Sequence, residues 1–153
     1  MATKTTIQTL VNTERKLVIK KTAVYSGTVA EDDDATFIDV SDYTSMSGRA
    51  CSYVSIDKVW AYAGPVTLEL RWASSTSYLA IAMGGTSTAV SPGIYYDFSA
   101  WGGLKPPTFG SAITISDAAV GAGTPTGDLV TSTISATSGE QYVVVVEGTK
   151  HYA

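Results

Sequence analysis

The chain contains very little of the chemistry on which most enzyme and metal sites depend. Among its 153 residues there is one cysteine, Cys51, and one histidine, His151. A single cysteine forms no internal disulfide bond, so the core alone has to hold the fold. A zinc site takes three or four Cys, His or carboxylate ligands, which this pair does not supply. His151 lies near the end of the chain, where little holds an imidazole for catalysis, so we expect a solvent-exposed side chain.

Charge is also scarce. Charged residues make up 16% of the chain, compared with about 25% in a typical soluble domain. The formal net charge is −4 and the isoelectric point is 4.8, so the basic surface that nucleic-acid binding needs is missing. Ser, Thr, Gly, Ala and Val take the place of the charges. Such a neutral surface is typical of proteins that pack against copies or partners, although ordinary all-β domains share it.

Long apolar runs are absent as well. The longest strongly apolar run is Val143 to Val146, far short of the ~20 residues that cross a bilayer as a helix. The Thr-rich residues 1–10 lack the apolar segment of a secretory signal. We therefore expect a protein that is made in a reducing cytoplasm and has no membrane anchor.

Strand patterns dominate, because no stretch of a dozen residues has the apolar stripe of a helix. In residues 66–72 the apolar side chains alternate with Thr, Glu and Arg, which predicts one buried face: Val66, Leu68, Leu70 and Trp72. In residues 53–62 Val54 and Ile56 fall in line with Trp60 and Tyr62, which predicts that Trp60 also belongs to the core. Lys58 is the one interruption. Gly64-Pro65 predicts an antiparallel hairpin between these two strands.

The remaining strands follow the same alternation. They are predicted at residues 16–25, 36–40, 77–83, 94–98, 112–116, 128–134 and 141–148. Many short strands separated by Gly, Pro and Ser turns predict an all-β, antiparallel β-sandwich of the jelly-roll type. The length fits a single domain, residues 14–153. Residues 1–13 are polar and Thr-rich, and they form either an extended N-terminal arm or an edge strand. Val144 and Val146 are predicted to be buried.

Two segments are candidates for contacts with a partner. We expect residues 2–12 to pair with the sheet edge of a neighbouring chain, with pairing to their own sandwich as the alternative. The side-chain contacts would come from three residues: Ile7, Leu10 and Val11. Residues 99–110 form a Gly/Pro loop with three large apolar side chains: Trp101, Leu104 and Phe109. These side chains either tuck under the loop, which we favour, or contact a partner.

The densest cluster of charge begins at residue 31 with EDDD and continues to Asp39 and Asp42. It lacks the spacing of a calcium-binding loop. Adjacent acids on an extended chain alternate sides and repel one another, which favours a solvated turn over a metal or catalytic site. Asp39 and Asp42 are interpreted as turn residues that accept bonds from nearby backbone amides. No phosphate-binding motif occurs, and nothing pairs two carboxylates across a cleft. We predict no catalytic residue, no cofactor and no metal.

Several longer segments resemble a family of small structural proteins encoded in the virion gene clusters of tailed bacteriophages. They span nearly the whole chain and comprise RKLVIK (15–20), EDDDATFIDVS (31–41), KVW (58–60), LRW (70–72), DFSAWGGLK (97–105), TGDLVTSTI (126–134) and YVVVVEGTK (142–150). The resemblance implies a capsid decoration or cement protein on the exterior of the virion. Its partners would be the major capsid protein or copies of itself in a homo-oligomer, with no nucleic acid and no membrane.

Two other functions remain open. A neck or tail component, such as a connector or terminator, would form a ring. A carbohydrate-binding module would need exposed aromatic side chains in one plane, for which Trp101, Tyr95 and Tyr96 are the candidates, because Trp60 and Trp72 are expected in the core.

Overall fold

The computed structural model describes residues 4–25, 34–64, 66–84, 93–107, 121–134 and 139–153. These residues form nine strands and two short 3-10 turns, η1 (Val40–Asp42) and η2 (Ser99–Trp101). The strands are β1 (Lys4–Asn12), β2 (Lys16–Val24), β3 (Ala35–Ile38), β4 (Cys51–Gly64), β5 (Thr67–Trp72), β6 (Tyr78–Gly84), β7 (Ile94–Asp97), β8 (Leu129–Ile134) and β9 (Gln141–Tyr152). None of the described residues belongs to a helix that is long and apolar enough to cross a membrane.

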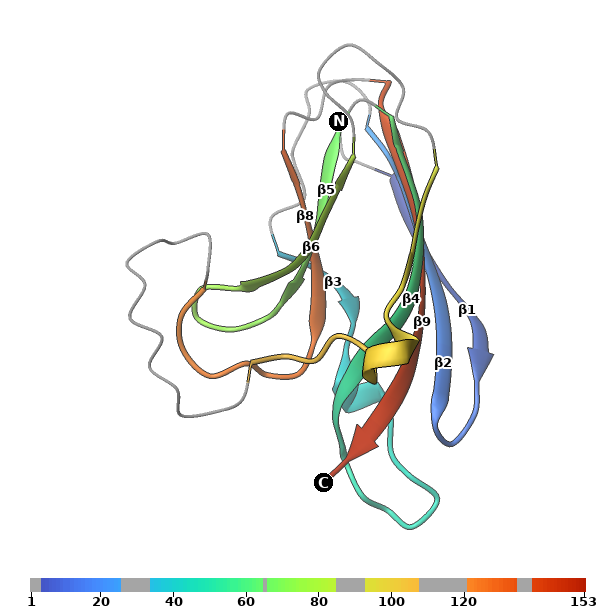
Figure 1. Cartoon of the computed structure of the whole chain (residues 1–153), viewed down its shortest axis with the longest axis vertical. Coiled ribbons are helices and arrows are strands. Elements are labelled where there is room, and N and C mark those ends of the chain that lie inside the picture. Colours follow the sequence, from blue (N-terminus) through green and yellow to red (C-terminus); the bar gives the residue numbers. More distant parts are fainter. Residues whose placement is uncertain (1–3, 26–33, 65, 85–92, 108–120, 135–138) are drawn as a thin grey trace.

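The strands form two antiparallel sheets that face each other (Figure 1). The five-stranded sheet has the order β1-β2-β9-β4-β7, and the four-stranded sheet has the order β3-β8-β5-β6. This confirms the prediction of an all-β, antiparallel sandwich. The jelly-roll connectivity stays a prediction. We call the face of the five-stranded sheet that is turned away from the four-stranded sheet its outer face.

The core lies between the two sheets and follows the period-two pattern of the sequence. From β9, Val144 and Val146 are fully buried, as predicted. On the opposite sheet Leu68 and Leu70 are also fully buried, and Trp72 is 2% exposed. Val66 lies just before β5 and is buried with them. The predicted face of residues 66–72 is therefore confirmed.

The predicted hairpin between residues 53–62 and 66–72 is wrong. β4 pairs with β9 and β7 in one sheet, whereas β5 pairs with β6 and β8 in the other. The chain thus crosses from one layer to the facing layer after Gly64. Both strands turn an apolar face to the same core, and turn residues do not distinguish a reversal within a sheet from a crossing between sheets. The strand predicted at 112–116 lies outside the described residues.

Candidate interaction surfaces

The first surface is the free edge of β1. This strand pairs with β2 on one side, from Lys4 opposite Val24 to Asn12 opposite Leu17, and no other described strand lies along its second side. All nine residues are exposed. Because alternate side chains point to opposite faces, neither face of β1 is covered. Its apolar side chains are Ile7, Leu10 and Val11, which are 45%, 47% and 39% exposed.

The edge of β1 has few of the features that protect a free strand from pairing. Natural sheets protect edges with charges, proline or β-bulges. β1 has one charged residue, Lys4, and one irregularity, where the register with β2 shifts between Thr9 and Val11. From Lys4 to Thr9 the pairing is regular, so the backbone groups on the free side form an uninterrupted row.

Residues 4–12 pair with β2 and form an edge strand of their own sheet, whereas pairing with a neighbouring chain stays a prediction. The turn after β1 is held by the end of β9. The Lys150 ammonium donates to the side-chain oxygen of Asn12 and to the Thr13 carbonyl, the latter at 2.6 Å. The Tyr152 hydroxyl donates to the Glu14 carbonyl at 2.5 Å. Of the two alternatives, arm or edge strand, residues 4–12 take the second. Hydrogen bonds order this polar segment, so it needs no apolar burial.

The second surface results from a β-bulge in β4. Ile56 lies opposite Gly148 and Lys58 lies opposite Glu147, so Asp57 is an extra residue without a partner on β9. One extra residue reverses the alternation of all the residues that follow it. Val54 and Ile56 point into the core before the bulge, and Val59, Ala61 and Ala63 do so after it.

Trp60 is therefore on the outer face, 39% exposed, and its predicted place in the core is wrong. The signal for this was Lys58, a charged residue at a position that simple alternation assigned to the core. If one residue is skipped at this point, the aliphatic residues of β4 fall on a single face: Val54, Ile56, Val59, Ala61 and Ala63.

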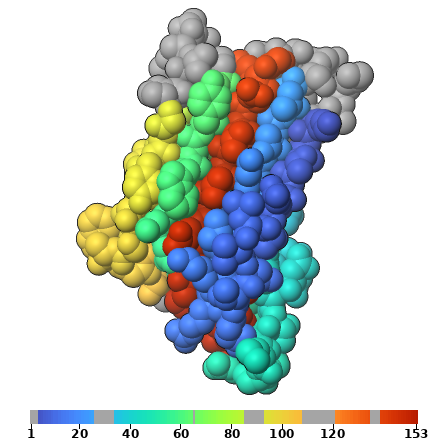
Figure 2. Space-filling view, turned by 90° about the vertical axis from the view of Figure 1, so that its right-hand side faces the viewer, coloured from blue at the N-terminus to red at the C-terminus, as the bar shows by residue number. Residues whose placement is uncertain are grey.

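The reversal creates an aromatic groove on the outer face, over β9, β4 and β7. Figure 2 shows this face, with the strands in the order β7, β4, β9, β2, β1 from left to right. Trp60 lies opposite Val145 on one side and Tyr95 on the other. The groove has a volume of about 400 Å³ and is lined by Trp60, Ala61, Tyr62, Gly93, Ile94, Tyr95, Val143 and Val145. None of these side chains is charged.

A loop covers β4 beyond the end of β7. Phe98 donates its N–H to the Asp57 carbonyl at 2.7 Å, and Leu104 exchanges two backbone hydrogen bonds with Ile56 at 2.8 and 2.9 Å. Leu104 packs against the core, which agrees with the favoured tucked arrangement. Trp101 does not, because it is 78% exposed at the tip of η2. Phe109 lies outside the described residues.

Trp101 is exposed because of how the loop is folded. The Trp101 and Gly103 amides both donate to the Phe98 carbonyl, which closes a tight turn. Gly102 and Gly103 have φ of +76° and +80°, the left-handed region that favours glycine. The turn directs Leu104 to the strand and leaves Trp101 in solvent.

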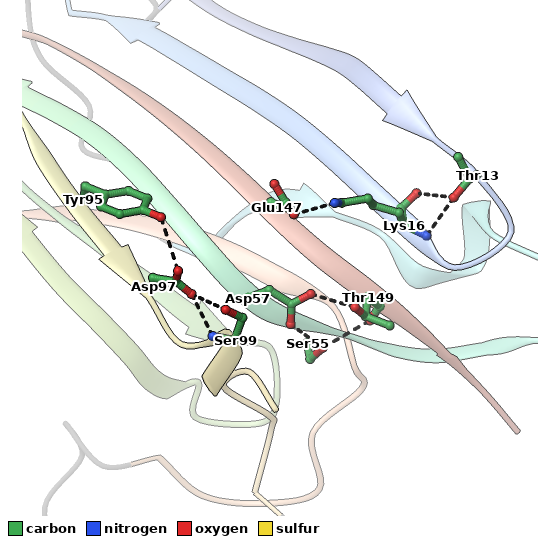
Figure 3. Close-up of polar contacts among 9 residues, drawn as sticks. All are labelled: Thr13, Lys16, Ser55, Asp57, Tyr95, Asp97, Ser99, Glu147 and Thr149. Atoms are coloured by element: carbon green, nitrogen blue, oxygen red, sulfur yellow. Dashed lines mark hydrogen bonds and ion pairs between the residues drawn. The ribbon is translucent and has the colours of Figure 1, made fainter. Parts of the chain in front are cut away.

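A polar cluster lies beside this loop, but its geometry does not fit nucleophilic catalysis. His151 Nε2 lies 3.1 Å from the Ser55 hydroxyl oxygen. The Asp57 carboxylate accepts from Ser55 at 3.2 Å and from the Thr149 hydroxyl at 2.6 Å (Figure 3). In a catalytic triad the carboxylate holds the histidine, not the serine. Ser55 is also only 1% exposed.

His151 is not the solvent-exposed residue that we predicted. It lies in β9, and its ring stacks on Tyr53 with centroids 4.4 Å apart and an interplanar angle of 13°. Burial lowers the pKa of the imidazole below its usual 6.5, and the positive charge of Lys105 lowers it further. The neutral form is thus favoured at this position.

The acidic stretch is described from Asp34 onward, and Glu31, Asp32 and Asp33 lie outside the described residues. Asp34 accepts bonds from the Ser77 and Ser132 hydroxyls, which tie it to two neighbouring segments. Asp39 caps η1 by accepting from the Ser41 amide at 2.9 Å, as predicted for a turn residue. Asp42 ends the same turn. Within the described part of the chain, no three His, Cys, Asp or Glu side chains are placed to hold a metal ion.

The comparisons with known proteins add no relative to this description. Neither a protein-family model, nor a curated protein, nor a solved structure gives a significant match to the chain.

Proposed function

We propose that the chain is a non-enzymatic structural protein of a tailed-phage virion. In this proposal it decorates the capsid exterior and stabilises the head by binding neighbouring subunits. The sequence resemblance supplies the setting. The observation that carries the mode of binding is the free edge of β1, nine exposed residues long.

A free edge binds another chain by strand addition, in which main-chain hydrogen bonds supply affinity and side chains supply specificity. The side chains of β1 suit this role on both faces. Ile7 shares the face of its partner Lys21, which points inward, and Val11 shares the face of its partner Val18, which points outward. An added strand would thus contact an apolar residue on each face.

The partner is the major capsid protein or another copy of this chain. The low charge of β1, with Lys4 as its one charged residue, leaves little electrostatic repulsion against either. Trp101 offers a second contact, because a tryptophan that is 78% exposed supplies a large apolar area to a partner.

Binding to capsids from which the protein has been removed tests the proposal. Ile7→Glu places a charge on the free edge and should weaken binding severalfold or more, because a carboxylate within a strand pair loses its water. Ile134→Glu is the matched control. Ile134 is equally exposed, 47% compared with 45%, but lies on β8 of the other sheet. Equal binding by both variants and the wild type would contradict strand addition at β1.

Electron microscopy of virions labelled with an antibody to this chain distinguishes a position on the head from a position at the neck or tail. We expect label over the head. Label at the neck or tail would replace the decoration role with that of a connector or tail component.

A further inference from the structure

The aromatic groove on the outer face is not explained by the fold or by strand addition at β1. Trp60 and Tyr95 are 39% and 51% exposed, with ring centroids 5.2 Å apart and planes tilted by 33°. Neither ring contributes to the core between the sheets. Contiguous exposed aromatic side chains that the core does not use are candidates for a binding site. We propose that the groove binds a neutral, pyranose-containing oligosaccharide.

The shape of the groove depends on the directions of two of its aromatic side chains, Tyr62 and Tyr95. The Tyr62 ring leans along β4 toward Gly64, since a methyl group built on Gly64 would lie 3.4 Å from the Tyr62 hydroxyl. Tyr95 leans the other way, because its hydroxyl donates to Asp97 at 3.4 Å (Figure 3). Gly93 adds no side chain between them. The Tyr62 and Tyr95 rings thus point away from each other, and both line the groove together with its apolar residues.

The size of the groove favours a small ligand over a protein chain. Its volume of about 400 Å³ lies within the usual range for small-molecule sites. A stable protein interface needs roughly 800 Å² from each partner, and the outer face becomes polar next to the groove. On β2, Lys20 and Thr22 lie opposite the two valines that line the groove, Val145 and Val143. The apolar area thus ends where a protein partner would need it to continue.

The lining of the groove favours a neutral ligand over a phosphate or a nucleic acid. Single-stranded nucleic acids also stack on aromatic rings, but their sites combine the rings with a positively charged groove. The lining here has no charged side chain. The charged groups beyond Tyr95 are Asp97 and, directly opposite it on β4, Lys58. Hydrogen bonds from the Ser99 hydroxyl and amide, together with the charge of Lys58, lower the pKa of the Asp97 carboxyl, which keeps it ionised. The two opposite charges offset each other, so this end of the groove does not attract an anionic ligand.

A pyranose ring matches these features. One face of the ring carries several C–H groups whose partial positive charge is attracted to the negative face of an aromatic ring. Its edge carries hydroxyl groups, which need donors and acceptors around an apolar surface. The Tyr62 and Tyr95 hydroxyls and the Asp97 carboxylate supply both at the rim. The sugar-binding proposal does not rest on the proposed role in a virion.

A glycan array probed with the labelled protein, followed by calorimetric titration, tests the proposal. The titrations use four neutral oligosaccharides (maltohexaose, cellohexaose, chitohexaose and mannohexaose) together with any glycan that the array identifies. We expect millimolar or tighter binding by at least one of them. Trp60→Ala should weaken that binding about tenfold or more, as expected for the loss of one stacking ring.

Leu79→Ala is the control matched for exposure, because Leu79 is 41% exposed on β6 of the other sheet and its loss should leave binding unchanged. Thermal melts check that both variants are folded. The proposal is overturned if no glycan binds at millimolar concentration, or if binding survives Trp60→Ala. It is also overturned if Trp60→Ala instead dissociates an oligomer in sedimentation experiments, because the groove would then face another protein chain.

Discussion

The two edges of the five-stranded sheet are built in different ways. At one edge β1 extends for nine residues with neither face covered and with no described strand along its free side. At the other edge β7 is four residues long, and the loop after it hydrogen-bonds to β4 through Phe98 and Leu104. We call the β1 side the open edge and the β7 side, with its loop, the closed edge. An open edge is a liability that natural sheets usually protect. Protection of one edge and exposure of the other therefore point to use of the exposed one.

The same comparison separates two kinds of stabilising contact. The closed edge depends on side chains and on close backbone approach, with Leu104 against the core and Gly103 against β4. The open edge depends on hydrogen bonds to β2 and on the contacts of its turn with Lys150 and Tyr152. Substitutions at the two edges should therefore have different effects on stability.

The largest effect is expected at Gly103. Its φ of +80° disfavours any other residue, and an added Cβ would lie 2.5 Å from the Asp57 carboxylate and 3.1 Å from the Ile56 carbonyl oxygen. Gly103→Ala should cost about 2–4 kcal/mol in the free energy of unfolding, from strain and from displacement of the loop.

Gly102 is the control for Gly103, because its φ is +76° but a Cβ there meets nothing within 4 Å. Gly102→Ala should cost only the backbone strain, about 1 kcal/mol. Urea denaturation of both variants measures the difference. Equal destabilisation would mean that the loop does not press against β4 as described.

A smaller difference is expected between two leucines, one at each edge. Leu104 packs against the core, and Leu104→Ala should lower the free energy of unfolding by about 2 kcal/mol. Leu10 is 47% exposed, and Leu10→Ala should cost less than about 0.5 kcal/mol. A large loss at Leu10 in the isolated protein would show that β1 is needed for the fold itself, which would weaken the case that its edge is reserved for a partner.

The smallest effect is a pH dependence at His151, which lies in the central strand β9. The folded-state pKa of His151 lies below 6.5 because burial disfavours the charged ring. As the pH falls through 6.5 the unfolded chain takes up the proton first, so stability falls until the pH drops below the folded-state pKa. As the pH is lowered through 6.5, the melting temperature of the wild type should fall relative to that of His151→Gln. Parallel curves would mean that His151 does not titrate differently in the folded state.

Most of the residues that face the core were predictable from alternation alone. The buried face of residues 66–72 and the buried valines of β9 follow directly from a period of two. The exchange between sheets after Gly64 was not predictable, because a strand that faces the core has the same pattern in either layer. The edge strand β1 was predicted only as one of two alternatives, since its exposed residues show no apolar face.

The aromatic groove was not predicted from the sequence, because it depends on a single extra residue in β4. A single bulge at Asp57 reverses the facing of Trp60 and Tyr62, and one extra residue changes the apolar pattern only at Lys58. The exposure of Trp101 depends on a turn formed by two left-handed glycines. Both features are set by backbone geometry at one or two residues, which period-two patterns do not contain.

Amide hydrogen exchange on capsids tests most directly whether the open edge of β1 is the binding site. The free protein and the capsid-bound protein would be compared at residues 4–12, with β6 (Tyr78–Gly84), an edge strand of the other sheet, as the reference. We predict that exchange slows strongly in β1 on binding and stays unchanged in β6, because strand addition would bond the free amides of β1 alone. Unchanged exchange in β1, with protection appearing elsewhere, would contradict the proposal.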